Sequence, residues 1–289
     1  GRGAFYRCGS LTEITIPGTV QNIGRYAFAR CKNLQRTTIE EGVTKLPKYM
    51  FQYDRSLTEV NLPTTLTSIG AKAFERTAVK SIPDNVTRIA YAAFASCTAL
   101  ENINLQNVES VGSHAFANCT GLKSVTVGNK LTKISGAMFR NDQGLESIEL
   151  PETIQSIGPR AFQNTSLKSI QLPSNVTAVA YGTFKSCTAL ETADLSKAKN
   201  IASVGAEAFK GTAIKKMEIP SKVTDIAYRA FGYCTALEQV TLNEGLASIG
   251  QGAFSNCEKL TPLKVPNTLG VNKMEKHAYG FERTLAADN

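Results

Sequence analysis

The sequence contains no tryptophan, only two histidines, and no apolar run near the roughly 20 residues that a membrane-spanning helix requires. Seven cysteines in 289 residues are too few for a small disulfide-stapled scaffold. Neither His114 nor His277 belongs to a recognisable metal-ligand or nucleophile motif, and no phosphate-binding glycine loop or C-x-x-C pair occurs. We therefore expect no cofactor, no metal site and no catalytic residues, and hence no enzyme activity.

Hydrophobic residues make up 42% of the chain, which is enough to bury a substantial core and excludes a disordered protein. Twelve of the 13 phenylalanines recur at intervals of 20 to 25 residues, a period typical of repeat proteins. They are Phe5, Phe28, Phe51, Phe74, Phe94, Phe116, Phe139, Phe162, Phe184, Phe209, Phe231 and Phe254. We interpret them as one structural position that is used once in each coil of a stacked array.

Aligned on this phenylalanine, the repeat reads A-F-x-x-C-x-x-L-x-x-I-x-L-P-x-x-V-x-x-I-G. The first apolar segment has the alternation of a half-buried strand, as at Leu100, Ile103 and Leu105. The V-x-x-I pair predicts a second, shorter extended segment, and the glycine after it indicates a turn or a close approach to the neighbouring coil. The A-F dipeptide is predicted to lie on a tight 3₁₀ turn that points the phenylalanine inward. Because one coil cannot bury its own apolar face, the coils must stack.

These residues resemble the BspA-like (Treponema pallidum type) leucine-rich repeat family, in a pattern that runs from Ala4 to about Leu285. The resemblance implies a β-rich leucine-rich repeat solenoid of about 12 coils, with stacked parallel strands and short 3₁₀ or helical turns. It also implies a bacterial surface or secreted protein linked to adhesion and protein binding. The family has no catalytic motif to carry over.

We expect one solenoid domain over residues 1–289. Its first repeat is cut in half at Gly1, and residues 266–289 are predicted to form a degenerate closing cap. The chain shows no signal peptide, so a cell-surface or extracellular location follows from the family resemblance alone. No transmembrane segment is predicted, and we expect a monomer.

All seven cysteines lie three residues after a repeat phenylalanine, so one structural position explains every thiol. Neighbouring coils bring pairs such as Cys8 and Cys31 within the Cα distance of a disulfide. Their parallel Cβ vectors would leave the Cβ atoms too far apart, so we expect a buried column of free thiols. Three coils have threonine at this position, and two have aspartate, Asp54 and Asp142.

The outward-facing residues of the predicted strands form an extended surface, usually the concave side of a solenoid. Five of them are acidic and three are basic, whereas the whole chain has a net charge of +8, so the excess positive charge must lie elsewhere. This balance argues against nucleic acid as the partner of this face. The candidate ligand-binding residues are Glu59, Asn61, Asn102, Asn104, Ser124, Thr126, Ser147 and Glu149. Their small polar side chains suit a protein or glycan ligand, and they suit a solvated sheet equally well.

A second candidate surface is the edge that carries Tyr91, Tyr181 and Tyr228, each of which follows an alanine where other coils have glycine. These tyrosines either bind a partner or pack over the widened turns, and we favour packing.

The leading hypothesis is a non-enzymatic cell-surface or secreted protein that recognises a host or extracellular protein or glycan through its repeat surface. The alternative is a structural spacer that positions another domain absent from this chain.

Overall fold

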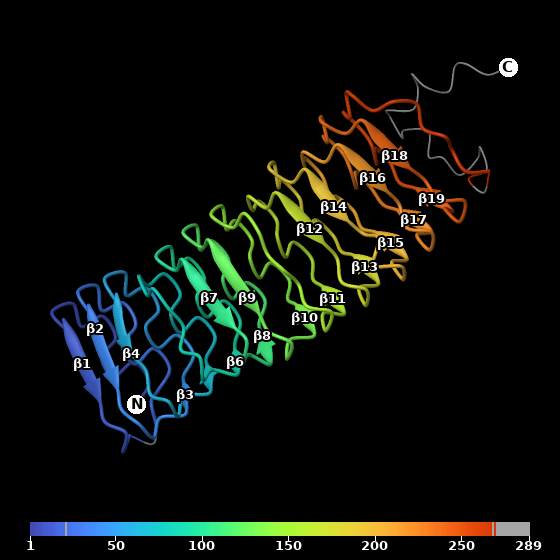
Figure 1. Cartoon of the computed structure of the whole chain (residues 1–289). Coiled ribbons are helices and arrows are strands. Elements are labelled where there is room, and N and C mark those ends of the chain that lie inside the picture. The colour runs from blue at the N-terminus through green and yellow to red at the C-terminus, as the bar shows by residue number, and fades with distance from the viewer. Residues whose placement is uncertain (21, 268, 270–289) are drawn as a thin grey trace. The chain divides into compact units, whose positions relative to one another are not determined.

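The computed structural model of the chain describes residues 1–20, 22–267 and 269. Its contacts divide the chain into two compact units, unit 1 with residues 1–131 and 135–145, and unit 2 with residues 132–134 and 146–289. Each unit is built from stacked coils of short strands and turns, and the described residues contain no helix (Figure 1). The single array over 1–289 remains a prediction, and the expected cap at 266–289 lies outside the described residues except for 266, 267 and 269.

The longer strands form where the sequence alternates apolar and polar residues, and equivalent strands pair in parallel. In unit 1 these are β1 (Glu13–Ile16), β2 (Arg36–Ile39), β4 (Glu59–Asn61), β7 (Asn102–Leu105) and β9 (Ser124–Val127), paired in the orders β1-β2-β4 and β7-β9. In unit 2 they are β12 (Ser169–Gln171), β14 (Thr192–Asp194), β16 (Lys216–Glu218) and β18 (Gln239–Thr241), paired as β12-β14 and β16-β18. Glu13, Arg36 and Glu59 are register partners, so the strands pair as the sequence repeat predicts.

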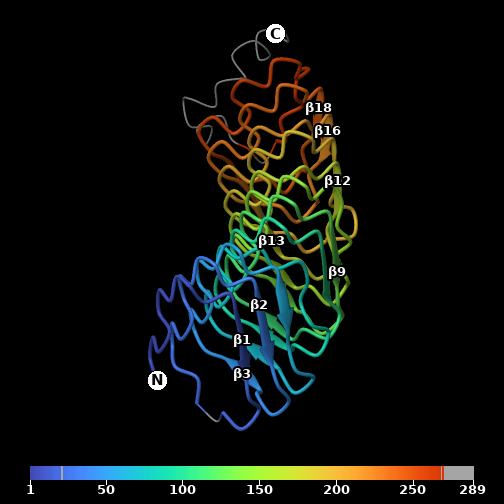
Figure 2. The same ribbon diagram turned by 90° about the vertical axis from the view of Figure 1, so that its left-hand side faces the viewer.

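The V-x-x-I segments form the predicted second extended element, a two-residue strand on another side of each coil. Unit 1 has β3 (Lys45–Leu46), β5 (Ser68–Ile69), β6 (Arg88–Ile89) and β8 (Ser110–Val111) in one parallel sheet. Unit 2 has β10 (Lys133–Ile134), β11 (Ser156–Ile157), β13 (Ala178–Val179), β15 (Ser203–Val204), β17 (Asp225–Ile226) and β19 (Ser248–Ile249). Figure 2 shows β12, β16 and β18 of unit 2 along one side, with β13 away from them.

The phenylalanines form the stacked inner column that their spacing predicts. Neighbouring ring centroids lie 5.1 to 5.9 Å apart in unit 1 and 5.2 to 5.6 Å apart in unit 2, with nearly parallel planes. Phe51 and Phe116 are fully buried, whereas Phe5 in the first coil is 42% exposed. Each buried ring contributes roughly 1.5–3 kcal/mol by leaving water, so the column supplies a large share of the stability.

The turn that carries each phenylalanine is not the expected 3₁₀ turn. The residues two before and two after every repeat phenylalanine have a positive φ, such as Tyr26 at 60° and Arg30 at 64° around Phe28. The Phe28 amide donates to Met50 O at 3.0 Å and the Arg30 amide to Gln52 O at 2.9 Å, in the next coil. The left-handed residues thus turn alternate N–H groups toward the neighbouring coil, and the turns form a third hydrogen-bonded ladder.

The glycines after the V-x-x-I pair confirm the expected close approach of neighbouring coils. A Cβ atom at Gly70 would lie 2.6 Å from Leu46 O, and one at Gly112 would lie 2.4 Å from Tyr91 N. Glycine and larger residues alternate strictly at this position, in the order Gly24, Pro47, Gly70, Ala90, Gly112, Ser135, Gly158, Ala180, Gly205, Ala227 and Gly250. The coils that carry Gly24, Gly70 and Gly112 in unit 1, and Gly205 and Gly250 in unit 2, therefore lie close to the preceding coil.

Candidate functional site

The predicted ligand-binding residues are exposed on the surface that the longer strands present, which we call the strand face. In unit 1, Glu59 and Asn61 lie on β4, Asn102 and Asn104 on β7, and Ser124 and Thr126 on β9. In unit 2, Ser147 and Glu149 lie in the coil before β12, in a segment outside the strands. The predicted in-out alternation is confirmed, while the binding role of these residues stays a prediction.

Many strand-face side chains bond to one another between coils. Ser124 Oγ donates to Asn102 Oδ1 at 2.5 Å, and Asn61 Nδ2 donates to Thr38 Oγ1 at 3.3 Å. Asn104 Nδ2 donates to an Asp84 carboxylate oxygen at 3.0 Å. The strand face of unit 1 is thus a polar surface whose groups satisfy part of their own hydrogen-bonding capacity.

Several cations on or beside the strand face are each paired with a carboxylate one coil earlier. These ion pairs are Arg36–Glu13 at 2.8 Å and Lys123–Glu101 at 2.9 Å in unit 1, and Lys168–Glu146 at 2.5 Å and Lys215–Glu191 at 2.8 Å in unit 2. All eight side chains are more than half exposed, so each pair contributes only about 0–1 kcal/mol to stability. Their main effect is to neutralise local charge.

In unit 2 the strand face is hollowed around two of the predicted residues. Ser147 and Glu149 line an open hollow of about 430 Å³, together with Gln171, Glu152 and Lys197. The Glu152 carboxylate lies 3.8 Å from Lys197 Nζ. This carboxylate also accepts hydrogen bonds from the amide and the hydroxyl of Ser174 in the next coil, and these bonds lower the pKa of Glu152. The hollow therefore offers an ionised carboxylate, a second acid, an amide and hydroxyl groups to a polar ligand.

Sequence reasoning identified Ser147 and Glu149 as candidates on this face but missed Glu152 and Lys197. Lys197 enters from the long segment between Phe184 and Phe209, which are 25 residues apart where 22 or 23 is usual. That spacing was the available signal, because extra residues in a stacked coil must leave the regular path and can reach the neighbouring surface.

The three tyrosines of the predicted aromatic edge remain partly exposed, at 48% for Tyr91, 38% for Tyr181 and 41% for Tyr228. Each ring has a cation over it. Lys72 Nζ lies 5.9 Å from the Tyr91 ring centroid, and the Cζ atoms of Arg160 and Arg229 lie 4.9 and 5.0 Å from those of Tyr181 and Tyr228. These lysine and arginine side chains cover part of each aromatic surface.

Tyr181 also belongs to a closed ionic network around the buried Glu207. Lys185 and Lys210 each donate to the Glu207 carboxylate at 2.6 Å, and the Tyr181 hydroxyl donates to it at 3.1 Å. Burial alone would raise the pKa of Glu207, but these three hydrogen bonds and the nearby lysine charge outweigh it and lower the pKa to about 2. The polar atoms of this part of the edge are therefore engaged within unit 2.

The cysteine column has the packing expected of structural thiols. All seven cysteines are free, and five are buried. Cys97 Sγ donates to Phe74 O at 3.0 Å, and Cys234 Sγ to Phe209 O at 3.1 Å, so each thiol bonds to the preceding coil. Burial raises the pKa of Cys97 to about 12, which removes the thiolate that nucleophilic chemistry requires.

The buried aspartates of this column also have a structural contact. Asp54 Oδ1 accepts the Cys31 amide hydrogen at 2.8 Å, and Asp142 Oδ1 accepts that of Cys119 at the same distance. Burial raises the pKa of both carboxyls, that of Asp54 to about 8. Across the part of the chain that the structure describes, no three His, Cys, Asp or Glu side chains gather as metal ligands.

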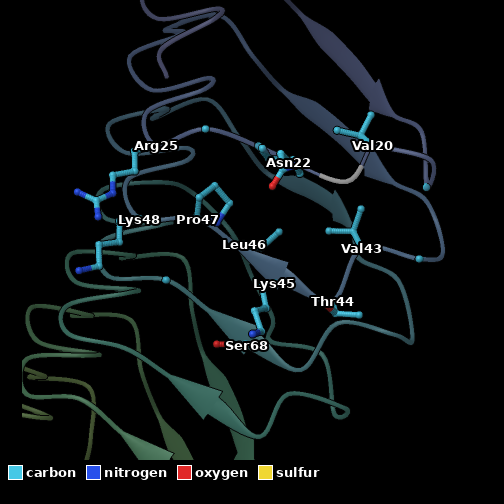
Figure 3. Close-up of a pocket in the computed structure, with 15 residues that line it drawn as sticks. Val20, Asn22, Arg25, Val43, Thr44, Lys45, Leu46, Pro47, Lys48 and Ser68 are labelled. Carbon is cyan, nitrogen blue, oxygen red and sulfur yellow. The ribbon is translucent and has the colours of Figure 1, made fainter. Parts of the chain in front are cut away.

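A larger hollow, of about 730 Å³, lies beside β3 and β5 in unit 1 (Figure 3). Arg25, Lys45 and Lys48 line it, and Figure 3 shows Arg25 and Lys48 next to each other at one side. None of the described residues that line it is acidic. Sequence reasoning did not identify this cationic hollow, although Arg25 and Lys48 occupy the same repeat position, three residues before the phenylalanine.

The parallel strands, the stacked phenylalanine ladder and the repeated thiol position together define a leucine-rich repeat solenoid. The chain belongs to the family described as the BspA type leucine rich repeat region (6 copies), which it matches over residues 1–82, 79–191 and 156–285. A comparison with curated proteins gives no match. The described residues include no helix with the length and apolar character needed to cross a bilayer.

Several solved structures resemble the chain over most of its length. A leucine-rich repeat protein from Bacteroides ovatus is 28% identical, with 93% of this chain and 82% of the other covered and a TM-score of 0.67. A leucine rich cell surface protein from Faecalibacterium prausnitzii is 24% identical, with 89% and 88% covered and a TM-score of 0.53. A leucine-rich repeat protein from Eubacterium ventriosum is 20% identical, with 89% and 80% covered and a TM-score of 0.61. The last two likenesses show the fold alone.

Proposed function

We propose that this chain is a non-enzymatic recognition protein of a bacterial cell surface or of the extracellular medium, which binds an extended segment of a host or extracellular protein through its strand face. One observation carries the proposal. Most coils present two outward polar positions in register, and in unit 2 Ser147, Glu149 and Gln171, which occupy such positions, line the hollow. An extended polar peptide matches such a row of regularly spaced hydrogen-bonding groups. The surface location rests on what membership of the family implies.

The test begins with binding of the intact chain to a panel of extracellular matrix proteins, measured by biolayer interferometry. Any protein that binds is measured again with Glu149→Lys and Gln171→Ala, which change the hollow, and with Tyr228→Ala as a control on the aromatic edge. We expect about 5- to 140-fold weaker binding for the hollow variants, because an interface that loses a paired polar group typically loses 1–3 kcal/mol. The control should bind within about twofold of the wild type.

Two results would overturn the proposal. Binding that Tyr228→Ala weakens while Glu149→Lys leaves it intact would transfer the site to the aromatic edge. Uniformly absent binding across the panel would favour the alternative, a structural spacer. In that case the self-bonded polar groups of the strand face would serve only to keep the sheet solvated.

A further inference from the structure

The excess positive charge of the chain lies on the turns that carry the phenylalanines. We define the turn edge as the residues three and two before, and one and two after, each repeat phenylalanine. These positions hold twelve Lys or Arg and two Glu, a net charge of +10 where the whole chain has +8. They also hold eight of the nine tyrosines. The remainder of the chain is therefore slightly acidic, and this one edge is cationic and aromatic.

Unit 1 concentrates these residues in its first coils. From residue 2 to residue 91 its turn edge has seven cations, five tyrosines and a single acid, Glu75. The cations are Arg2, Arg7, Arg25, Arg30, Lys48, Lys72 and Arg76, and the tyrosines are Tyr6, Tyr26, Tyr49, Tyr53 and Tyr91.

Backbone geometry does not explain this choice of side chains. Arg7, Arg30, Tyr53 and Arg76 all occupy the position two after the phenylalanine, where φ is positive. Five of the other eight coils have glycine or asparagine at this position, at Asn118, Asn141, Asn164, Gly211 and Asn256, and the remaining three have Ser96, Ser186 and Tyr233. Asparagine and glycine adopt left-handed backbone more readily than arginine or tyrosine, so the fold alone would favour them. The presence of arginine and tyrosine at this position therefore needs an explanation other than backbone conformation.

The rings and the guanidinium groups hold one another in place. The Tyr53 ring lies between two arginines, with Arg30 Cζ from the preceding coil 4.7 Å and Arg76 Cζ from the following coil 5.2 Å from its centroid. Tyr26 and Tyr49 stack with centroids 4.4 Å apart and planes 5° from parallel. A guanidinium stacked on a ring keeps its N–H groups free for an anion, and its orientation is fixed before any ligand arrives.

These arginines lack the carboxylate partners that neutralise the strand face. Among the described residues from 2 to 91, one ion pair forms on the turn edge of unit 1, between Lys72 and Glu75 at 3.4 Å. Arg7, Arg30 and Arg76 form no ion pair. Coils stack about 5 Å apart, so like charges on neighbouring coils repel one another. A row of unpaired cations held in register is the complement of a polymer with regularly spaced negative charges.

The patch also has concave features that a polymer could occupy. Arg2, Tyr6, Tyr26, Arg30 and Gln52 line a shallow hollow of about 540 Å³ on the turn edge. Arg25, the neighbour of Tyr26 in the sequence, lines the cationic hollow of Figure 3 together with Lys48. Arg25 and Tyr26, neighbours in the sequence, thus line one hollow each, and both hollows offer a guanidinium group together with amide or hydroxyl groups.

We propose that the turn edge of unit 1 binds an anionic polysaccharide that carries sulfate or carboxylate groups. The guanidinium forks of Arg7, Arg30 and Arg76 match the paired oxygens of such groups, and Gln52 and the tyrosine hydroxyls can bond to sugar hydroxyls. A single-stranded nucleic acid fits less well, because its bases need open aromatic faces and two arginines already lie over the Tyr53 ring. An extended peptide could not add as a strand, because the turn amides of these coils already donate to the next coil.

The experiment measures binding of the intact chain to immobilised heparin at several salt concentrations. The test variant is Arg7→Asn/Arg30→Asn/Arg76→Asn, which replaces each arginine by the residue that other coils use at the same left-handed position, so the fold is retained. The matched control, Arg36→Gln/Lys123→Gln/Lys168→Gln, removes the same charge from paired cations near the strand face. Far-UV circular dichroism and the urea midpoint of each variant verify the fold.

We expect the wild type to bind heparin with an affinity that falls steeply as salt is added. The test variant should bind at least about tenfold more weakly and with a shallower salt slope. The control should bind with an affinity within about threefold of the wild type. Absent wild-type binding, or equal losses in both triple variants, would overturn the proposal. Tighter binding of polyglutamate, an oligonucleotide or phosphatidylserine vesicles than of heparin would overturn the polysaccharide assignment. The strand-face variant Glu149→Lys should leave heparin binding unchanged, so this proposal and the proposed protein-binding function can fail separately.

Discussion

The buried carboxyls of Asp54 and Asp142 predict that unit 1 becomes less stable as the pH rises from about 4 to about 8. Both side chains are fully buried, and each has one oxygen bonded to a cysteine amide at 2.8 Å. Burial raises the pKa of Asp54 from its ordinary 3.8 to about 8, because a charged carboxylate is poorly solvated there, and raises that of Asp142 well above its ordinary value.

The sign follows from the number of protons that each state binds. Between pH 4 and pH 8 the folded chain keeps the Asp54 proton, whereas the unfolded chain has released it. Folding therefore takes up a proton, and a rise in pH disfavours it. Within this window Asp54 lowers the free energy of unfolding by at most about 1.4 kcal/mol per pH unit, a value that is reached only where the folded form is fully protonated. Asp142, whose pKa is also raised, acts in the same direction.

The assay is urea unfolding of the intact chain at four pH values between 4.5 and 7.5, followed by far-UV circular dichroism. The variant Asp54→Asn/Asp142→Asn keeps an acceptor oxygen for each cysteine amide but cannot ionise. We expect it to lose most of the decline in stability with pH and to exceed the wild type near pH 7.5. Glu109→Gln, which removes an exposed carboxylate, should follow the wild type. An unchanged slope in the double variant would refute the reasoning.

Two further predictions concern the core and the spacing of the coils. Phe116→Ala should reduce the free energy of unfolding by about 3–5 kcal/mol, because the ring is fully buried between two others, whereas Phe5→Ala, at a ring that is 42% exposed, should cost distinctly less. A loss below about 1 kcal/mol at Phe116 in urea unfolding would contradict the column. Gly112→Ala should cost about 1–3 kcal/mol, because its Cβ would lie 2.4 Å from Tyr91 N, while the nearest atom to a Cβ at Gly9 is 3.5 Å away. Equal urea midpoints for Gly112→Ala and Gly9→Ala would disprove the contact.

The strands, their parallel register and the buried phenylalanines were predictable from sequence, because each follows from a period that recurs many times. The turns were not. Tyr26 and Arg30 have side chains that ordinarily avoid positive φ, so their residue types give no sign of left-handed backbone. Hydrogen bonds from the turn to the next coil fix that conformation, and such contacts between coils are invisible in a single repeat.

The exposed residues of the strand face were predictable from sequence, because they follow the alternation of apolar and polar residues along each strand. Glu59 and Asn102 are exposed, as a period of two requires. The contacts around Tyr53 were out of reach, because they depend on how side chains from three successive coils turn toward one another. Charge balance gave a partial signal, since a neutral to acidic strand face in a chain of net charge +8 requires a cationic surface somewhere else.

The strict alternation of glycine with larger residues after the V-x-x-I pair sets the step in which such a chain can lengthen or shorten during evolution. If the coil that carries Gly112 were deleted, Ser135 would take the place of Gly112 beside the backbone of Ala90 and Tyr91. That place has no room for a Cβ atom. Deleting or duplicating two successive coils, about 45 residues, would restore a glycine at every tight junction. A pair of coils is thus the unit that could be added or removed without placing a side chain at a tight junction, although the sequence repeat is a single coil.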